Sequence, residues 1–416
     1  MLYGIHDARS LLKAKPEKVE AIARRRLRFI INEAHRKVPF YSNTFRSMGL
    51  RSDDVKDADE LSKLPVLTKR DVLEQREQLL NEDFQPNYCF VRSTSGSTGE
   101  PVTYFFDPKA WYYLEGITLR GQLQGGLKLK DRVAVVGSPH AIARNIFYKT
   151  LSRLGRLKYL SVFDDVVANL SSLQNFGPNV LKTFPSFLKA AIESNVSFHC
   201  PLVFSMSEAI DQSLRKGVDI AFGARVIDLY GAVELTTIAW QCKESSLYHL
   251  DSDVVIVEAV KLDSDSPANP GEPARILVTG LVNRAMPLIR YELGDIAVLS
   301  DDECSCGVKL PLMTRIEGRR VDCIRLPSGQ LLSPYVFTQW AREIVGIRQY
   351  QIVQEEENRI LVKIVPGLSF NKNLLSKWVS NLAEIVGENV RVDAEVVDTI
   401  LMEKPGKYKY IVSKVK

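Results

Sequence analysis

The sequence contains neither a long apolar run nor many cysteines. No stretch of about 18 consecutive apolar residues occurs, which is the minimum for a membrane-spanning helix, so we expect no membrane span. The N-terminal residues carry early charges and no apolar segment that ends in a small-residue cleavage site, so we expect no secretory signal. Six cysteines among 416 residues are too few for a disulfide scaffold, and a cytoplasmic location is the simplest expectation.

A strong net charge and a Walker A loop are also missing. The 55 basic and 50 acidic residues leave a formal net charge of +5, which permits a basic cleft for a polyanionic small molecule. That excess is too small to predict a nucleic-acid partner. No glycine-rich segment ends in Gly-Lys-Ser or Gly-Lys-Thr, so a Walker A loop is excluded. The composition, 45% hydrophobic and 25% charged, is that of a globular chain long enough for two or three domains.

Hydrophobic periodicity predicts an α/β protein. Residues 17–50 have apolar side chains at helical spacing with a break at Pro39, and Arg24–Arg26 are expected on a solvated face of that helix. Thr68 is the expected N-cap of a following helix. From about Cys89, β-rich runs alternate with helical segments, which favours a core of largely parallel strands. The expected strands are 90–92, 102–106, 133–136, 203–206 and 226–229, and the expected helices are 111–124, 141–156 and 185–194.

The remainder of the chain predicts a β-rich region and then a small domain. Residues 253–300 contain expected strands alone, which favours an antiparallel sheet or a distorted β-barrel. A boundary is expected near residues 318–322, which gives a large N-terminal domain of residues 1–318 and a small α+β domain of residues 323–416. The small domain is expected to contain helices at 333–344 and 372–386 and strands at 349–354, 359–365 and 390–397.

Residues 91–101, VRSTSGSTGEP, concentrate hydroxyl groups and glycines between two expected strands. Glycine reaches φ > 0 and lets the backbone approach a ligand closely, so successive N–H groups can point at an anion. The hydroxyl groups, from Ser93 onward, add further donors. A flexible surface linker has a similar composition, but the strands that adjoin this segment on both sides favour anion binding.

The segment Ser95-Gly96-Ser97-Thr98-Gly99-Glu100-Pro101 resembles the signature loop of the adenylate-forming superfamily. That superfamily includes acyl-CoA synthetases, adenylation domains of peptide synthetases and luciferases. The resemblance implies that the loop binds the phosphates of ATP and that Thr98 takes part in catalysis. The implied binding residues are Ser95, Gly96, Ser97, Thr98 and Gly99. The family lysine after the proline is Val102 here, so this chain departs from the family by one cation.

Residues 228–234, DLYGAVE, are similar to the Tyr-Gly-x-Thr-Glu motif of the same family, with Val233 in place of threonine. The resemblance implies that Tyr230 packs on adenine and that Glu234 helps to hold Mg²⁺. Both roles suit the side chains, because an aromatic face suits a purine and a carboxylate is a hard oxygen ligand. Residues 205–209, SMSEA, resemble the preceding segment that lines the adenine site. The implied nucleotide-binding residues are Ser207, Glu208, Asp228, Tyr230 and Gly231, and Ala232 is an implied substrate-pocket residue.

Three further motifs follow in the family's order. Residues 287–295, PLIRYELGD, match the Arg-Tyr-x-x-Gly-Asp block, whose acid, here Asp295, is expected to accept hydrogen bonds from the ribose hydroxyls. The role of Arg290 is open between binding and structure. Residues 317–322, EGRRVD, resemble the Gly-Arg-x-Asp-Asp hinge, which implies a hinge at 319–322 with Arg319 near the ribose or phosphate. One hinge acid is Val321 here, so the pivot residue is open.

The third of these motifs is residues 402–410, MEKPGKYKY, which resemble the C-terminal Gly-Lys motif of the family. The resemblance implies that Lys407 neutralises the charge that grows on the α-phosphate and the leaving pyrophosphate. Lys404 and Lys409 are the alternatives. Considered without the preceding motifs, a lysine in such a basic segment is more often a solvated surface residue.

The resemblance covers essentially the whole chain and points to the phenylacetate–CoA ligase branch, including its capsule-biosynthesis relatives. The short length and the segments KVPFYSNTF, LPVLTKRDV and CSCG carry it. It implies ATP, Mg²⁺ and coenzyme A as cofactors, and a small-molecule carboxylic acid that is activated to acyl-AMP and passed to coenzyme A. Transfer to an amine or a carrier stays open, as does a non-catalytic nucleotide-binding role in surface-polysaccharide biosynthesis. The identity of the acid and the oligomeric state are open.

A set of cysteines and one histidine could hold a metal ion. Cys304-Ser305-Cys306-Gly307 places two thiols within reach of one ion, and Cys242 and His249 lie upstream. Three thiolates and one imidazole would complete a closed tetrahedral site, which indicates structural Zn²⁺. The spacing is not that of a zinc finger, so free thiols and a surface histidine remain the alternative.

Two positions are candidates for the acid pocket. His140 follows an expected strand at the carboxyl edge, where open α/β sheets bind ligands, and it is either a pocket residue or a loop histidine. The aromatic residues Trp111, Tyr112 and Tyr113 on the expected helix 111–124 are more typical of a core.

Overall fold

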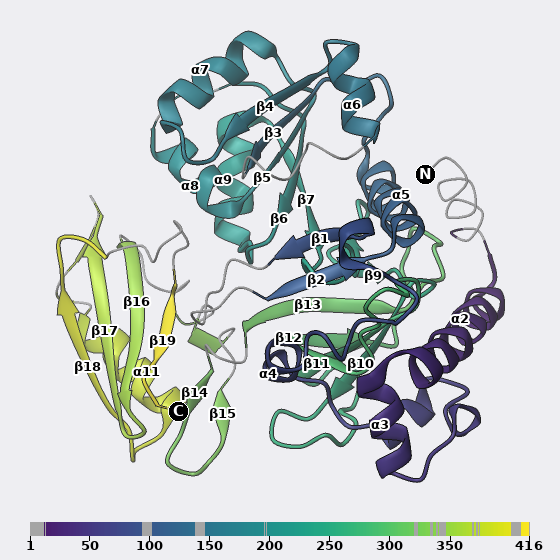
Figure 1. Cartoon of the computed structure of the whole chain (residues 1–416). Helices are drawn as coiled ribbons and strands as arrows, with labels where there is room; N and C mark the ends of the chain where they lie inside the picture. Colours follow the sequence, from purple (N-terminus) through teal and green to yellow (C-terminus); the bar gives the residue numbers. More distant parts are fainter. Residues whose placement is uncertain are drawn as a thin grey trace. The chain divides into compact units, whose positions relative to one another are not determined.

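The computed structural model describes most of the chain, and Figure 1 shows its helices and strands. The described residues are 12, 14–93, 102–137, 146–194, 196, 198–319, 323–332, 336–337, 340, 347–367, 370–371, 373, 375–400 and 409–415, with the backbone alone at 146 and 147. They form two compact units, and each is described by itself. The first unit comprises Met1–Glu258, Leu277–Leu293 and Leu299–Arg315, and the second comprises Ala259–Ile276, Gly294–Val298 and Ile316–Lys416.

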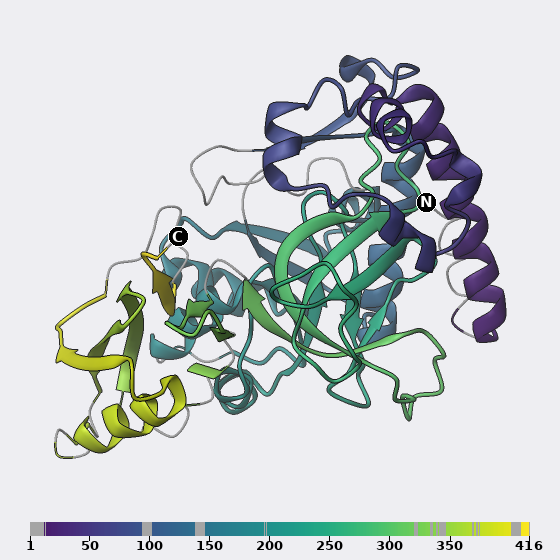
Figure 2. The same cartoon turned by 90° about the horizontal axis from the view of Figure 1, so that it is seen from below.

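Helices form the N-terminal part of the first unit, and prolines stand at the start of two of them. α2 spans Pro16–Lys37 and α3 spans Pro39–Ser47, with proline in the first turn, where its missing N–H breaks no helical hydrogen bond. Figure 2 shows both helices in purple. α2 buries an apolar stripe that includes Leu27, Ile30 and Ile31. The predicted helical region with a break at Pro39 is confirmed.

Short turns and a capped helix follow α3. The 3₁₀ turns are η1 (Ser52–Asp54), η2 (Asp59–Lys63) and η3 (Pro86–Tyr88), and α4 spans Lys69–Glu74. The Thr68 side chain accepts a hydrogen bond from the Asp71 N–H, and the Asp71 carboxylate accepts one from the Thr68 N–H at 2.8 Å. This reciprocal capping box confirms Thr68 as the predicted N-cap.

A parallel sheet with helices on both faces forms the centre of the first unit, as predicted. Its strands are β3 (Val133–Gly137), β4 (Leu157–Ser161), β5 (Val180–Thr183), β6 (Leu202–Met206) and β7 (Arg225–Tyr230), in the order β4-β3-β5-β6-β7. The helices are α5 (Pro108–Gly125), α6 (Ile146–Arg153), α7 (Val166–Phe176), α8 (Pro185–Glu193) and α9 (Gln212–Phe222). Apolar residues of α7, α8 and α9 form a core with one face of the strands, and those of α5 and α6 form a core with the other face.

The close approach of α5 to the sheet depends on a glycine. A Cβ added at Gly125 would lie 2.7 Å from the Phe204 ring, which is closer than side chains normally pack. Glycine at this position therefore lets the end of α5 lie against β6 and β7. The helix then ends at Gly126, whose φ of 116° is readily adopted by glycine.

A contact between α5 and α2 changes the expectation that Arg26 of α2 lies on a solvated face. Arg26 Nη2 donates a hydrogen bond of 2.7 Å to Tyr113 Oη on α5, and Arg26 forms an ion pair of 3.6 Å with Asp253. Arg24, in contrast, pairs with Glu20 at the surface. The solvated-face prediction is therefore wrong for Arg26, because periodicity along one helix does not reveal which neighbouring element covers it.

Further strands extend the parallel sheet. They are β8 (Ala239–Gln241), β9 (Tyr248–Leu250), β10 (Val255–Val260), β11 (Ala274–Gly280), β12 (Tyr291–Ser300) and β13 (Leu312–Arg319). The sheet of 11 strands has the order β10-β11-β12-β13-β9-β8-β7-β6-β5-β3-β4. The β7–β8, β8–β9 and β9–β13 pairs are antiparallel, so the sheet changes from parallel to antiparallel pairing after β7. The prediction of strands alone between 253 and 300 is confirmed.

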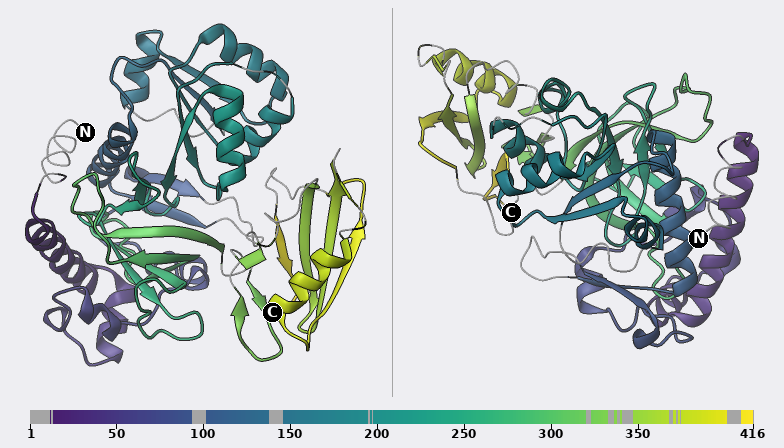
Figure 3. Two further views of the ribbon diagram at one scale, coloured as in Figure 1. Left: turned by 180° about the vertical axis from the view of Figure 1, so that it is seen from behind. Right: turned by 90° about the horizontal axis from the view of Figure 1, so that it is seen from above.

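The C-terminal part of the second unit is an α+β structure, as predicted. It contains a four-stranded sheet of order β18-β17-β16-β19, the strand pair β14–β15 and the helix α11. The bounds are β14 Ile324–Arg325, β15 Leu331–Leu332, β16 Ile347–Glu356, β17 Arg359–Pro366, α11 Leu375–Val386, β18 Arg391–Val396 and β19 Ile411–Ser413. Trp378, Leu382 and Val386 of α11 form a core with the strands, and Figure 3 shows α11 against one face of the sheet.

Two further expectations concern a membrane span and the domain boundary. Among the helices that the structure describes, none is both long and apolar enough to cross a membrane. The domain boundary near 318–322 stays a prediction, and residues 320–322 lie outside the described part of the chain.

Candidate functional site

A β-hairpin carries the predicted phosphate-binding loop. β1 (Phe90–Ser93) and β2 (Thr103–Phe106) pair antiparallel, with Ser93 opposite Thr103 and a 3.1 Å contact between their hydroxyl oxygens. The loop candidates Ser95, Gly96, Ser97, Thr98 and Gly99 lie outside the described residues. Val102, which stands where relatives have lysine, is 1% exposed, so this position belongs to the apolar core.

Three non-glycine residues in the described part of the chain have positive φ, and all three lie in or beside the predicted motifs. Ser207 (67°) follows β6, Thr236 (69°) follows Glu234, and Arg290 (51°) precedes β12. Such conformations cost energy for residues with a Cβ and cluster at functional sites. The backbone strain thus falls on the same segments that motif similarity selected.

The loop after β7 is closed tightly on itself. The Ile238 N–H donates to the Tyr230 carbonyl at 2.9 Å, and the Thr236 N–H donates to the Ala232 carbonyl at 2.7 Å. A Cβ added at Gly231 would lie 2.1 Å from the Thr236 carbonyl oxygen, so only glycine fits there. This loop begins at the carboxyl end of a central parallel strand, where open α/β sheets bind ligands. It carries the predicted residues Tyr230, Gly231, Ala232 and Glu234.

The carboxyl group of Glu234 is buried among tyrosines. Glu234 is 9% exposed, and its carboxylate is hydrogen-bonded to Tyr291. Tyr291 Oη in turn lies 3.0 Å from Tyr104 Oη. Burial, followed by the Glu234 charge, raises the pKa of both tyrosines above the usual range. The sequence analysis did not select Tyr104 or Tyr291, although Tyr291 stands inside the PLIRYELGD motif.

Asp228 and Glu208 make contacts within the protein. The buried Asp228 carboxylate accepts a 2.8 Å hydrogen bond from Tyr248 Oη, and burial raises the Asp228 pKa against the opposing effect of that bond. Glu208 accepts hydrogen bonds from both the N–H and the hydroxyl of Ser186, at 2.9 and 3.0 Å, in the first turn of α8. Both acids therefore stabilise the segments at the carboxyl edge, and Glu208 ties the strained Ser207 to a helix N-terminus.

The second unit brings together two further candidates. Asp295 of β12 and Arg319 at the end of β13 form an ion pair of 3.8 Å, with side-chain exposures of 19% and 54%. Both side chains therefore remain reachable from solvent. Arg290, in the first unit, is 3% exposed and binds Glu258 at 3.0 Å. Of its two open roles, the contacts of Arg290 support the structural one.

The remaining catalytic and pocket candidates are only partly described. Lys407, Lys404 and His140 lie outside the described residues, whereas the backbone of Lys409 accepts a hydrogen bond from Gln351. Trp111 is 5% exposed and packs against Phe90 and Phe106. Trp111 is thus a core residue, as expected.

The predicted metal ligands Cys242, His249, Cys304 and Cys306 lie together in the first unit. Their ligand atoms are all within 4.8 Å of one another, with Cys242 Sγ 3.6 Å from Cys304 Sγ and Cys306 Sγ 3.3 Å from His249 Nε2. Four ligands at tetrahedral Zn²⁺ distances are about 3.5–3.8 Å apart, so the set fits that ion. Burial lowers the pKa of His249 to about 4, which keeps the imidazole neutral, as a metal ligand must be.

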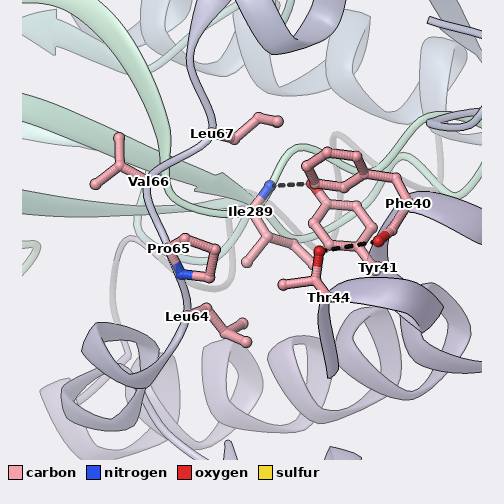
Figure 4. Close-up of a pocket in the computed structure, with 8 residues that line it drawn as sticks. All are labelled: Phe40, Tyr41, Thr44, Leu64, Pro65, Val66, Leu67 and Ile289. Carbon is pink, nitrogen blue, oxygen red and sulfur yellow. Dashed lines mark hydrogen bonds between the residues drawn. The ribbon is translucent and has the colours of Figure 1, made fainter. Parts of the chain in front are cut away.

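A small apolar pocket lies beneath the PLIRYELGD motif (Figure 4). It is lined by Phe40, Tyr41, Thr44, Leu64, Pro65, Val66, Leu67 and Ile289. Tyr41 Oη accepts a hydrogen bond from the Ile289 N–H and donates one to the Pro287 carbonyl, each at 3.0 Å. The lining carries no charged side chain. We therefore interpret the pocket as the place where the segments KVPFYSNTF and LPVLTKRDV pack against the PLIRYELGD motif.

Comparisons with known proteins agree with this geometry. The CapK C-terminal domain family matches residues 325–414. A phenylacetate-coenzyme A ligase of Thermus thermophilus is 24% identical over 363 residues, which are 83% of this chain and 80% of that protein. The corresponding Escherichia coli enzyme is 24% identical over 75% of this chain and 73% of its own. Protein CapK of Staphylococcus aureus is 22% identical over 91% of this chain and 85% of its own.

Solved structures show the same fold. A 2-hydroxyisobutyryl-CoA ligase in complex with R3-HIB-AMP superposes with a TM-score of 0.80 at 18% identity, over 97% of this chain and 91% of that one. An anthranilate CoA ligase in complex with anthranoyl-AMP has a TM-score of 0.54 at 16% identity, over 77% and 65% of the two chains. With the motif order and the sequence relatives, these likenesses support the resemblance of the chain to the adenylate-forming superfamily, and to its phenylacetate-coenzyme A ligases and CapK in particular.

Proposed function

We propose that this protein is an AMP-forming carboxylate ligase. In the first half-reaction the carboxylate of a small acid attacks the α-phosphate of Mg·ATP, which yields acyl-AMP and pyrophosphate. In the second, the sulfur of a thiol attacks the acyl carbon of the mixed anhydride, and AMP leaves. The thiol we propose is that of coenzyme A, because sequence relatives over most of the chain are named coenzyme A ligases.

One structural observation supports this proposal independently of the names of the relatives. The loop after β7 holds an aromatic residue, Tyr230, and a nearly buried acid, Glu234, at the carboxyl end of a parallel strand. The strained Ser207 follows the neighbouring strand β6. An aromatic face for a purine and a hard oxygen ligand for a divalent cation are two of the groups that a Mg·ATP site requires.

The roles that we propose follow the motifs. Tyr230, with Ser207 and Gly231, would line the adenine site, and Asp295 and Arg319 would bind the ribose and phosphate. Glu234 would hold Mg²⁺, which supplies positive charge for the phosphate oxygens when bound. The phosphate loop would be formed by Ser95, Gly96, Ser97, Thr98 and Gly99, and the acid pocket would include His140 and Ala232.

The chemistry needs no nucleophilic or acid/base side chain in the first step. The attacking carboxylate is already ionised at neutral pH, so the residues act by positioning the reactants and by neutralising charge. We propose Lys407 as the cation that meets the negative charge of the leaving pyrophosphate. We further propose that residues 319–322 act as a hinge between the two half-reactions, with residues 323–416 as the mobile domain.

The acceptor of the acyl group has a second candidate. The C-terminal residues 325–414 match the CapK C-terminal domain, and the CapK alignment covers more of this chain than the coenzyme A ligase alignments do. The CapK name specifies no acceptor, so we keep transfer to an amine or a carrier as the alternative to coenzyme A. Release of AMP that depends on coenzyme A, measured against release that depends on amines, separates the two acceptors.

Exchange of labelled pyrophosphate into ATP tests the proposed function. The wild-type chain, with magnesium and a panel of aryl and aliphatic acids, is expected to show exchange that depends on at least one acid. Lys407→Ala should lower that exchange by about 100-fold or more, since a preorganised charge contributes several kcal/mol to the barrier. Lys404→Ala is the matched control and should retain activity. Folded wild-type protein without acid-dependent exchange would contradict the enzymatic proposal.

We also propose that Cys242, His249, Cys304 and Cys306 bind one structural Zn²⁺ ion. Four protein ligands leave no open position on the ion, and the set includes no water-accessible carboxylate. Its role would then be to join the β8–β9 strands to the segment between β12 and β13, with no part in the reaction.

A further inference from the structure

Glu234 belongs to a hydrogen-bonded group of three buried side chains. Its carboxylate is hydrogen-bonded to Tyr291, and Tyr291 Oη lies 3.0 Å from Tyr104 Oη. Tyr104 comes from β2, Tyr291 is the first residue of β12, and Glu234 lies in the loop after β7. Their exposures are 1%, 2% and 9%. Residues far apart in the sequence therefore meet at one carboxylate inside the first unit.

The hydrogen bonds among these three side chains have a definite direction. A carboxylate can only accept hydrogen bonds, and each phenol has a single proton to donate. Tyr291 must therefore donate to Glu234, which leaves the Tyr291 oxygen to accept from Tyr104. Tyr291 thus donates to Glu234 and accepts from Tyr104 at the same time.

The backbone around Tyr291 is also fixed. The Leu67 N–H donates to the Arg290 carbonyl at 3.0 Å, and the Glu292 N–H donates to the Leu67 carbonyl at 2.9 Å. The rings of Tyr104 and Tyr291 meet edge to face, with centroids 6.4 Å apart and an interplanar angle of 79°. The position of the Tyr291 hydroxyl is therefore set by both main-chain and ring contacts.

We propose that Tyr291, supported by Tyr104, is a positioning residue that orients the Glu234 carboxylate for a divalent cation. This inference rests on the proposed function, in which Glu234 holds the magnesium of Mg·ATP. Mg²⁺ requires oxygen ligands in near-ideal octahedral geometry, so a ligand that is free to rotate binds it poorly. A hydrogen bond from a neighbouring side chain fixes the orientation of a carboxylate ligand.

The same hydrogen-bonded side chains connect Glu234 to the hairpin that carries the predicted phosphate loop. Tyr104 is the second residue of β2, and only Val102 separates β2 from the SGSTGEP segment in the sequence. Tyr104 and Tyr291 would therefore hold the metal-binding acid at a fixed place relative to the base of this hairpin. A phenylalanine at position 291 would fill the same space but would leave both Tyr104 and Glu234 without this partner.

Isothermal titration calorimetry of the full chain with ATP tests the inference, once with excess Mg²⁺ and once with EDTA. In the wild type, Mg²⁺ is expected to strengthen ATP binding. Glu234→Gln and Tyr291→Phe should each reduce that strengthening. For Tyr291→Phe, which removes the hydrogen bond to the proposed ligand, the reduction should be about 10-fold. ATP binding in EDTA should change little in both variants. Tyr104→Phe should act in the same direction with a smaller effect. The double variant Glu234→Gln/Tyr291→Phe should bind no worse than Glu234→Gln, because Tyr291 acts through Glu234.

Tyr41→Phe is the matched control. Tyr41 is also buried and also loses a hydroxyl with two hydrogen bonds, but its partners are the backbone of Pro287 and Ile289. It should leave the Mg²⁺ effect unchanged. Full Mg²⁺ strengthening in Tyr291→Phe, an additive double variant, or an equal loss in Tyr41→Phe would each overturn the positioning role. A wild type that binds no ATP would instead contradict the proposed function. If thermal unfolding shows that Tyr291→Phe is not folded, Tyr104→Phe takes its place in the cycle.

Discussion

A single backbone position shapes the loop that carries Tyr230 and Glu234. The Thr236 carbonyl oxygen occupies the space that a Cβ at residue 231 would need, at 2.1 Å. Thr236 reaches this place with a φ of 69°, a conformation that costs free energy for a β-branched residue. The glycine of the Tyr-Gly motif is thus required by the fold of the loop, independently of any ligand.

We expect Gly231→Ala to destabilise the protein and to weaken ATP binding. The added methyl group meets backbone and not a flexible side chain, so the loop must open, at a cost of about 2 kcal/mol or more in the free energy of unfolding. Gly137→Ala is the control, since its Cβ would meet nothing nearer than 3.8 Å. Chemical denaturation measures the difference. Equal stability of the two variants would show that residue 231 has more room than the contact indicates.

At the scale of secondary-structure elements, a buried ion cluster joins α5 to the segment after β9. Arg120 Nη2 lies 2.6 Å from Asp251 Oδ1 and 2.7 Å from Asp253 Oδ1, and all three side chains have 0% exposure. Thr237, which follows the Tyr230–Glu234 loop, donates a 2.9 Å hydrogen bond to Asp251. The cluster therefore also anchors one end of that loop.

We expect Arg120→Met to lower stability by about 3–5 kcal/mol at neutral pH, because two buried carboxylates lose the buried guanidinium group that both of them bind. Burial already raises the Asp251 pKa, and Arg120 opposes that rise. Without Arg120 the folded-state pKa rises further above the unfolded value, so the folded state binds more protons. The stability deficit should therefore shrink as pH falls from about 8 to 5. Denaturation of both proteins across this range measures it.

The exposed pair of Arg24 and Glu20 offers a control for this experiment. Arg24→Met should change stability by less than about 0.5 kcal/mol at any of these pH values. A deficit in Arg120→Met that stays constant or grows toward low pH would contradict the assignment of Asp251 as the group responsible.

The proposed zinc site is another connection between elements. Protein purified without chelators is expected to contain about one Zn²⁺ per chain by elemental analysis. Cys304→Ser should lose the metal and unfold at lower temperature, since a structural zinc contributes directly to folding. Cys200→Ser is the matched control, because Cys200 is buried among apolar residues away from the cluster. Substoichiometric metal in the wild type would reject the site.

At the scale of the whole molecule, the motifs are distributed along nearly the entire chain, from the 95–101 loop to residues 402–410. The order of these motifs carried the resemblance to the adenylate-forming superfamily and its phenylacetate–CoA ligase branch before the fold was known. The alternation of strands and helices was also predictable, because hydrophobic periodicity is a local property. β4, α7, β5 and α9 were missed, since their short segments carry weaker local patterns.

Contacts between distant residues could not be predicted in the same way. Glu234 and its motif were found by similarity, but its bond to Tyr291 and the contact of Tyr291 with Tyr104 depend on how three separate elements meet. The same holds for Arg26, whose partner Asp253 lies on another part of the first unit. The four candidate metal ligands, three cysteines and one histidine, were selected from residue type, and only the fold brings their side-chain donor atoms within 4.8 Å of one another.

The sequence by itself determined those strands and helices that have strong local hydrophobic patterns, because these preferences act between near neighbours in the chain. It also carried the resemblance to the adenylate-forming superfamily, through short motifs in a fixed order. The tertiary structure decided which polar side chains are buried and with which partners, as Arg120, Asp251 and Tyr291 show. The physical reason is that burying a charge or a hydroxyl group is tolerated only where a partner from another element satisfies it, and that partner is fixed by packing.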